Sequence, residues 1–176
     1  PDRYLLVIGN RYLHKNTSFA LELLGVLRER HGWDGAVVLA GADVLHGSGT
    51  ALERKWVLEH PEHSQHVFDL GAVEQDEKAW LLSHAAGVVY PSVTEGFGLV
   101  PFEAAAAGVP CFFAPVSAMG EMFPPDAATL VAWDPAASAA KVAPALVAGP
   151  ERDAVISSIR SVATELTWDR TAELGE

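Results

Sequence analysis

The sequence predicts an α/β domain built on a doubly wound parallel sheet, the Rossmann-like class. Short apolar runs alternate along the chain with segments whose apolar residues recur at helical spacing. This alternation is typical of βα units, in which helices cover both faces of a parallel sheet. The chain has 176 residues, whereas a closed eight-unit barrel needs roughly 200 or more. An open sheet of five or six strands is therefore expected.

Strands are expected where a short apolar run ends at a turn residue. The run YLLVI, residues 4–8, ends at Gly9, and the run AVVLA, residues 36–40, ends at Gly41. Further strands are predicted at 66–70, 87–90 and 109–114, and a sixth at 128–131.

The segments between these runs carry helical signals. Asn16 or Thr17 can cap a helix over 16–30. Pro101 suits the first turn of a helix at 100–107. The other helices are predicted at 51–59, 76–84 and 138–165, the last with a break at Gly149–Pro150.

Composition and charge exclude several classes of protein. A formal net charge of −11 argues against a nucleic-acid-binding surface, and a hydrophobic content of 49% argues against disorder. The single cysteine, Cys111, excludes an internal disulfide. No signal peptide or membrane-spanning run is visible, so we expect a soluble, cytoplasmic domain. The abrupt start at Pro1 predicts that residues 1–176 are one domain of a longer protein.

The stretch PSVTEGFGLVPFEAAAAGVP, residues 91–110, holds two glutamates that are candidate site residues. Glu95 lies in the loop after the fourth strand, and Glu103 lies about one turn into the following helix. Ligands of doubly wound sheets bind beyond the carboxyl ends of the strands. Gly96 and Gly98 permit backbone conformations that other residues resist, and the helix amino end attracts anions. Both glutamates are therefore expected to face one ligand site.

The cations for a bound phosphate are expected from the first loop. Residues 79–140 contain no lysine or arginine, whereas GNRYLHKN, residues 9–16, supplies Arg11 and Lys15 beyond the first strand. One diphosphate could bridge the two loops. Carboxylates are strong acceptors for sugar and ribose hydroxyls, so Glu95 and Glu103 are interpreted as the groups that hold two sugar rings.

These motifs together resemble those of retaining GT-B glycosyltransferases, most closely glycosyltransferase family 4 (group 1). YPSVTEGFGLVPFEAAAAGVP resembles the Glu-x7-Glu signature of that family, and VIGNRYLHKN is similar to its first phosphate-binding loop. LGAVEQDEKAWLLSHAAGVVYPS resembles the segment that leads into the signature, and TWDR at 167–170 resembles its late tryptophan. SAMGEMF resembles a later loop, although Gly120 stands where a proline is common.

The resemblance implies that residues 1–176 are the carboxyl-terminal, donor-binding half of a two-domain enzyme, and that the amino-terminal acceptor domain would lie outside this chain. By position, Glu95 would contact the donor sugar, and Glu103 the ribose. Arg11 and Lys15 would hold the diphosphate. The remaining donor-binding positions would act mainly through the backbone; they are Gly9, Asn10, Val73 near the base, Gly96, Phe97, Gly98 and Leu99.

The resemblance also implies the reaction. A hexose would pass from a UDP-, GDP- or ADP-linked donor to a glycan, lipid or small-molecule acceptor, with retention and without a metal or other cofactor. Arg11 and Lys15 would stabilise the leaving nucleoside diphosphate, which itself could accept the acceptor's proton. The fragment alone is expected to be inactive. The intact protein would be cytoplasmic, or peripheral at the inner face of a membrane through the missing domain.

Three other functions stay open. A glycoside hydrolase also uses two carboxylates, but it has no need for the loop with Arg11 and Lys15. A GT-B phosphorylase or nucleotide-sugar epimerase would share the sheet. A non-catalytic nucleotide-binding or regulatory domain would not depend on Glu95 for activity.

Several other residues are interpreted as structural. His14 is a loop histidine that is expected to be structural or solvated, with contact to the ligand as the alternative, and Gly120 weakens any role for Glu121. Pro61 interrupts a helix among the nearby histidines, so a solvated loop is expected there rather than a metal site. Cys111 is expected in the core. Packing is also expected for the five tryptophans: Trp33, Trp56, Trp80, Trp133 and Trp168.

Overall fold

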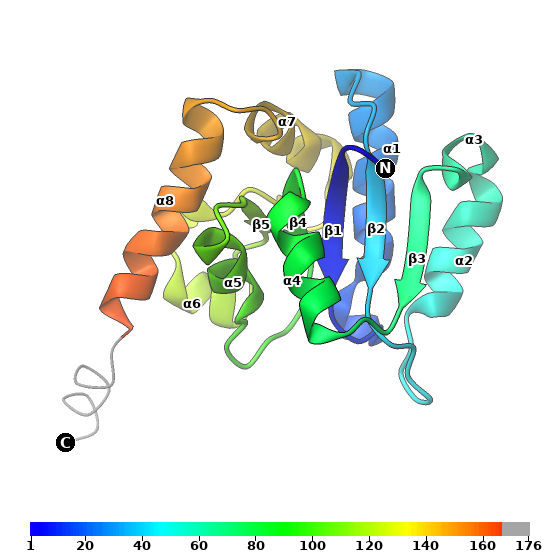
Figure 1. Ribbon diagram of the computed structural model, residues 1–176, viewed down its shortest axis with the longest axis horizontal. Coiled ribbons are helices and arrows are strands. Elements are labelled where there is room, and N and C mark those ends of the chain that lie inside the picture. Colours follow the sequence, from blue (N-terminus) through cyan, green and yellow to red (C-terminus); the bar gives the residue numbers. More distant parts are fainter. Residues whose placement is uncertain (167–176) are drawn as a thin grey trace.

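A computed structural model describes residues 1–166 of the chain, and it shows a five-stranded parallel sheet (Figure 1). The strand order is β3-β2-β1-β4-β5. The strands are β1 (Tyr4–Ile8), β2 (Ala36–Ala40), β3 (Val67–Gly71), β4 (Gly87–Tyr90) and β5 (Cys111–Phe113). The predicted doubly wound α/β class is therefore confirmed, and the five strands lie at their predicted positions to within two residues.

The predicted sixth strand at 128–131 is wrong. One ladder-like bond is present, because Leu130 N–H donates to the Phe113 carbonyl over 3.0 Å. The next residue bonds elsewhere: the Ser138 hydroxyl accepts from Val131 N–H at 2.9 Å and donates to the Val131 carbonyl at 3.2 Å. A side chain therefore satisfies the backbone groups that a strand would have paired.

Helices flank the sheet as the apolar periodicity predicts, with two additional short helices, α3 and α6. The helices are α1 (Thr17–His31), α2 (Thr50–Glu59), α3 (Pro61–Ser64), α4 (Gln75–His84), α5 (Val100–Ala106), α6 (Ala118–Met122), α7 (Pro135–Ala145) and α8 (Pro150–Glu165), with 3-10 turns η1 (Leu13–Lys15) and η2 (Pro125–Ala127). The predicted break at Gly149–Pro150 is present between α7 and α8.

Two apolar cores, one on each face of the sheet, hold the helices. Leu5 and Val37 point toward the core that contains α1 and α7, where Phe19 and Val142 are fully buried. Alternate strand residues such as Leu6 point to the other core, which contains residues of α4, α5 and α8. Burial on both faces explains why these strands are continuous apolar runs rather than alternating ones.

The carboxyl ends of β1 and β2 approach each other very closely. Gly9 N–H donates to the Ala40 carbonyl over 3.0 Å, and a Cβ on Gly41 would lie 1.8 Å from the Gly9 carbonyl oxygen. A residue with a side chain therefore cannot occupy position 41 unless this backbone shifts. The loops that leave β1 and β4 start side by side in the sheet, because these two strands are neighbours (Figure 1).

The buried side chains include the expected cysteine and some of the tryptophans. Cys111 is fully buried, and burial raises the pKa of its thiol. Trp33 and Trp56 are buried, but the prediction for Trp80 is wrong, because it is 57% exposed on α4. Trp133 packs edge-on against a buried aromatic ring. Trp168 and the TWDR motif at 167–170 lie outside the described residues.

Among residues 1–166, no helix has the length and apolar character needed to cross a bilayer.

Candidate functional site

The loops after β1 and β4 meet through one charge pair. Lys15 ends the turn η1, and Glu95 lies in the loop between β4 and α5. Lys15 Nζ lies 2.5 Å from Glu95 Oε1, and the two side chains are 23% and 13% exposed. The backbone joins the same loops, because Val93 N–H donates to the His14 carbonyl over 2.8 Å. Two predicted site residues thus meet although 80 positions separate them.

The surroundings of Glu95 keep it ionised. Burial alone would raise the pKa of this carboxyl, but the Lys15 ammonium and the hydroxyls of Ser92 and Tyr90 lower it below its ordinary value. Lys15 Nζ also lies 5.4 Å from the centre of the Tyr90 ring, within cation–π distance. Burial, followed by the Glu95 carboxylate, raises the pKa of Tyr90. At neutral pH Glu95 is therefore a hydrogen-bond acceptor and Tyr90 a protonated phenol.

Ser117 fixes the backbone of Glu95 from the other side. Its hydroxyl donates to the Glu95 carbonyl over 2.9 Å and accepts from Glu95 N–H over 3.2 Å. Ser117 has a φ of +53°, a conformation that costs energy for a residue with a side chain and occurs often at functional sites. Ser117 is not among the predicted site residues, although its place in the loop that follows the fifth strand is a signal in the sequence.

The two glycines of the EGFGL segment differ. Gly98 has a φ of +83°, and a Cβ there would lie 2.5 Å from Met119 Cε. Gly96 has open space around it and no positive φ, so the expected need for glycine is met at Gly98 and not at Gly96. Phe97 and Leu99 are exposed. Contact of this backbone with phosphate and sugar stays a prediction.

Glu103 lies on α5 and forms a two-pronged ion pair with Lys78 of α4. Lys78 Nζ lies 2.8 Å from Oε1 and 2.9 Å from Oε2 of Glu103. The pair lines a pocket of about 240 Å³ together with Gln75, Ala79 and Leu82. Lys78 was missed because it directly precedes the cation-free stretch 79–140, and α4 carries it across to α5.

Arg11 is placed differently from Lys15. The expectation was that both cations face one diphosphate, but the Arg11 guanidinium is turned toward α2 and β3. Its Nε lies 3.1 Å from Glu53 Oε1, its Nη2 pairs with the other Glu53 oxygen, and its Nη1 lies 2.8 Å from Asp69 Oδ1. Arg11 is 3% exposed. Phosphate binding by Arg11 stays a prediction, and it would require the side chain to leave these carboxylates.

The other predicted donor-binding positions also lie beyond the carboxyl ends of the strands. Gly9 has a φ of +127° directly after β1, and Asn10 is exposed. Val73 lies in the loop between β3 and α4 and packs partly against the core. Their contacts with a donor stay predictions.

The loops also carry the two residues whose roles were left open. His14 is exposed and stacks on Tyr12, with ring centres 5.4 Å apart. Glu121 is exposed on α6. At Gly120, a Cβ would lie 2.8 Å from the Pro115 carbonyl oxygen. A residue with a side chain at position 120 would therefore force the neighbouring backbone to shift.

The expectation of a solvated loop around the histidines is wrong for His63. Pro61 does not break the structure; it starts the short helix α3. This helix turns His63 inward, where it is 6% exposed. Within residues 1–166, the one group of histidine and carboxylate side chains with spacing suited to a metal ion is Glu29, Glu62 and His63. It lies away from the Lys15–Glu95 edge.

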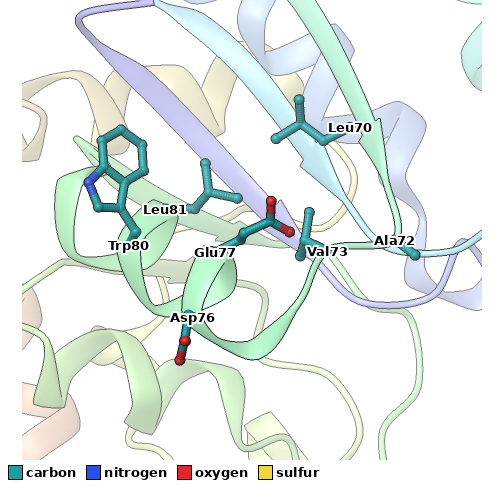
Figure 2. A pocket seen from close by; sticks show the side chains of 7 residues that line it. All are labelled: Leu70, Ala72, Val73, Asp76, Glu77, Trp80 and Leu81. Carbon is teal, nitrogen blue, oxygen red and sulfur yellow. The ribbon is translucent and has the colours of Figure 1, made fainter.

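A separate pocket of about 530 Å³ lies between the end of β3 and α4. Figure 2 shows the apolar side chains of Leu70, Val73, Trp80 and Leu81 around it, with the Glu77 carboxylate among them and Asp76 directed away. Glu77 is already used there, because its carboxylate accepts from Glu74 N–H over 2.8 Å and so caps α4. Lys78 and Glu103 do not line this pocket.

Comparisons with known proteins identify the family and the fold of the chain. The family model described as Glycosyl transferases group 1 matches residues 1–161. The N-terminal domain of a trehalose-6-phosphate phosphatase from Candida albicans is 15% identical, with a TM-score of 0.78 over 96% of this chain and 40% of that chain. WaaG, a glycosyltransferase involved in lipopolysaccharide biosynthesis, is 21% identical, with a TM-score of 0.68 over 96% of this chain and 44% of that chain. No curated protein matches the sequence.

A shorter structure is covered almost fully. The C-terminal domain of a glycosyl transferase group 1 family protein (LpcC) from Francisella tularensis is 19% identical, with a TM-score of 0.72 over 93% of this chain and 85% of that chain. By contrast, this chain spans less than half the length of the two proteins named above. Because the family model covers nearly the whole chain, this chain belongs to the group 1 glycosyltransferases, and its sheet has the fold of the C-terminal domain of a GT-B enzyme.

Proposed function

We propose that this chain is the donor-binding domain of a retaining glycosyltransferase of family 4, which transfers a hexose from a nucleoside-diphosphate sugar. The observation that carries the proposal is the contact between Lys15 and Glu95. It lies at the carboxyl ends of the neighbouring strands β1 and β4. A cation and an ionised carboxylate stand side by side there. A sugar diphosphate presents the matching pair, an anionic phosphate and hydroxyl donors.

Binding of the donor replaces the internal ion pair with two external contacts. Lys15 turns its ammonium to the diphosphate, and Glu95 accepts hydrogen bonds from sugar hydroxyls. Lys15 is suited to such an exchange, because its ammonium is a compact charge on a flexible stem. Its side chain is 23% exposed, so a ligand can reach it.

The nucleoside belongs beside Glu103. Its carboxylate would accept from the ribose hydroxyls, and Lys78 and Gln75 line the same pocket of about 240 Å³. Lys78 carries donors alone, so it would favour a base that presents a carbonyl oxygen there, as uracil and guanine do. The loop at Val73 would add backbone contacts.

The chemistry needs no proton transfer by Glu95. In the proposed reaction the glycosidic bond to the phosphate lengthens through an oxocarbenium-like state while negative charge grows on the leaving diphosphate. Lys15 stabilises this charge by a preorganised electrostatic contact. The acceptor oxygen bonds to the anomeric carbon on the face from which the phosphate leaves, and the leaving phosphate takes the proton of that hydroxyl. No metal ion takes part. The acceptor would bind to a separate amino-terminal domain in a protein that is cytoplasmic or peripheral to a membrane.

Calorimetric titration of the 176-residue chain with UDP, GDP, ADP and their hexose conjugates tests the proposal. We expect one nucleotide to bind, and Lys15→Ala to weaken this binding at least about tenfold, equal to about 1.4 kcal/mol. Lys55→Ala is the matched control, because Lys55 is 68% exposed and, within residues 1–166, forms its ion pair with the exposed Glu59 of its own helix. Equal affinity of wild type and Lys15→Ala would remove Lys15 from the site.

A regulatory nucleotide-binding domain is the alternative function. The intact parent protein separates the two, because loss of glycosyl transfer in Glu95→Gln supports the enzyme, whereas unchanged activity supports regulation.

A further inference from the structure

Three side chains from α1 and α3 lie close together at the amino-terminal end of the strands, whereas the Lys15–Glu95 contact lies at their carboxyl-terminal end. His63 Nε2 lies 3.1 Å from Glu29 Oε1 and 3.8 Å from Glu62 Oε1, and the three potential ligand atoms all lie within 4.8 Å of one another. We call Glu29, Glu62 and His63 the α1–α3 cluster. Glu29 comes from the last turns of α1, and the other two residues are consecutive in α3.

The spacing of these atoms matches the edge of a small coordination polyhedron. In a tetrahedral zinc site with bonds of about 2.0–2.2 Å, neighbouring ligand atoms are about 3.4 Å apart. The two distances from His63 Nε2, 3.1 and 3.8 Å, lie on either side of this value. The third distance, between the two carboxylate oxygens, is at most 4.8 Å. A shift of up to about an ångström in two exposed glutamate side chains would therefore bring the three ligand atoms around one ion.

The histidine is held in place before any ion arrives. The His63 side chain is 8% exposed and stacks near Trp56, with ring centres 6.0 Å apart and planes inclined by 14°. The ring also lies against Gly25 of α1, where a Cβ would stand in ordinary van der Waals contact with His63 Nε2 at 3.6 Å. A rigid imidazole with two mobile carboxylates is a favourable arrangement, since one ligand sets the position and the others adapt.

We propose that the α1–α3 cluster is a binding site for a divalent transition-metal ion, with zinc as the best match. Imidazole nitrogen and carboxylate oxygen suit Zn²⁺. Three protein ligands leave a fourth position for water, and the cluster is open there, because the Glu29 and Glu62 side chains are each 58% exposed. The two carboxylates neutralise the ion. Binding requires an unprotonated His63 Nε2, so protons compete with the metal at low pH.

The bound ion would fasten α3 to the end of α1. In the described structure the link between them within the cluster is the 3.1 Å contact of His63 with Glu29. A metal would add Glu62 to the link and stabilise the folded chain by mass action. The role is structural, because the cluster lies at the amino-terminal end of β3 rather than at its carboxyl end (Figure 1).

The test is titration of the untagged, chelator-treated chain with ZnCl2 at pH 7.5, followed by competition with a zinc-sensitive dye, and with CoCl2 followed by its visible absorption. We expect one site in the wild type and a loss of affinity of at least about tenfold in Glu29→Gln and in Glu62→Gln. Bound Co²⁺ should give the intense bands of low coordination in the wild type and lose them in both variants.

Glu59→Gln serves as the control, because Glu59 is an exposed carboxylate of the neighbouring helix, 57% exposed, that lies outside the cluster. It should bind zinc as the wild type does. Glu29 and Glu62 are exposed, so their amide variants keep the fold, and circular dichroism checks this. Absence of a zinc site in the wild type, or unchanged affinity in the double variant Glu29→Gln/Glu62→Gln, would overturn the proposal. Nucleotide binding is unaffected in either case.

Discussion

Glu95 and Lys15 form an ion pair at the carboxyl ends of β1 and β4, where the strand order of the sheet reverses, with 2.5 Å between Lys15 Nζ and Glu95 Oε1. Each side chain is assigned to a different part of the donor in the proposed function, the sugar for Glu95 and the diphosphate for Lys15. The pair therefore makes the two subsites interdependent: whatever changes one residue changes the electrostatic environment of the other.

The first prediction concerns bare nucleoside diphosphate. Glu95→Gln removes the carboxylate that competes with phosphate for Lys15, so we expect affinity for the bare diphosphate to rise roughly three- to fivefold, about 0.7–1 kcal/mol. Affinity for the nucleotide sugar should not gain in the same way, because the variant loses its hydroxyl acceptor. Paired calorimetric titrations measure both. A lower affinity of Glu95→Gln for the bare diphosphate would contradict the proposed competition.

The second prediction concerns the pKa of Glu95. Its folded pKa lies below the ordinary value of 4.5, so the carboxylate stabilises the fold above pH 4.5, and this contribution is lost as the pH falls through the lowered folded pKa. In Lys15→Ala the effect of burial, which raises the pKa, is no longer offset by the ammonium. We expect the pKa to rise relative to wild type, measured by carbon-detected NMR of the Glu95 carboxyl. An unchanged pKa would show that Lys15 does not contact Glu95 in solution.

The third prediction separates the two cations of the first loop. Arg11→Ala leaves Glu53, which is 3% exposed, as a buried charge without its main partner, so the free energy of unfolding should fall by about 3–5 kcal/mol. Replacement of both partners, as Arg11→Met with Glu53→Leu, should cost much less, because no charge is then left buried. Urea denaturation compares them. If Arg11→Ala unfolds like wild type but binds nucleotide weakly, Arg11 belongs to the phosphate site instead.

The fourth prediction concerns the close approach of β1 and β2. A Cβ at position 41 would lie 1.8 Å from the Gly9 carbonyl oxygen, so Gly41→Ala must push the two loops apart. We expect a loss of about 1–3 kcal/mol or more in unfolding free energy. Gly96→Ala is the control, because nothing lies within 4 Å of its added methyl group; its stability should stay close to that of wild type. Equal stability of both variants would show that the backbone at Gly41 relaxes freely.

Most of the sheet could be predicted from the sequence because β1, β2, β4 and β5 are buried and so appear as uninterrupted apolar runs, whereas the edge strand β3 is largely exposed and contains Asp69. The false sixth strand shows the limit of that signal. Residues 128–131 are also mostly apolar. The Ser138 hydroxyl, seven residues beyond Val131, bonds to both backbone groups of Val131, and no local pattern reveals such a contact.

The candidate site was predictable in part for the same kind of reason. Glu95 and Lys15 each lie in the loop that follows a strand, and the pairing of these two strands brings the loops together. The burial of Arg11 was not predictable, because its two carboxylate partners lie 42 and 58 positions away along the chain. Lys78 was missed because its proximity to Glu103 depends on how α4 crosses the sheet.

The strand order also determines when the Lys15–Glu95 contact can form during folding. The first three βα units, which end with α4, contain Lys15 and Arg11, whereas Glu95 arrives only when β4 inserts next to β1. Contacts between distant parts of the chain form slowly, because the entropy of closing a long loop must be lost first. A chain that emerges from the ribosome would therefore build its basic loop early and gain the acidic counterpart late. A nucleotide sugar that needs both Lys15 and Glu95 could then bind only after β4 has joined the sheet.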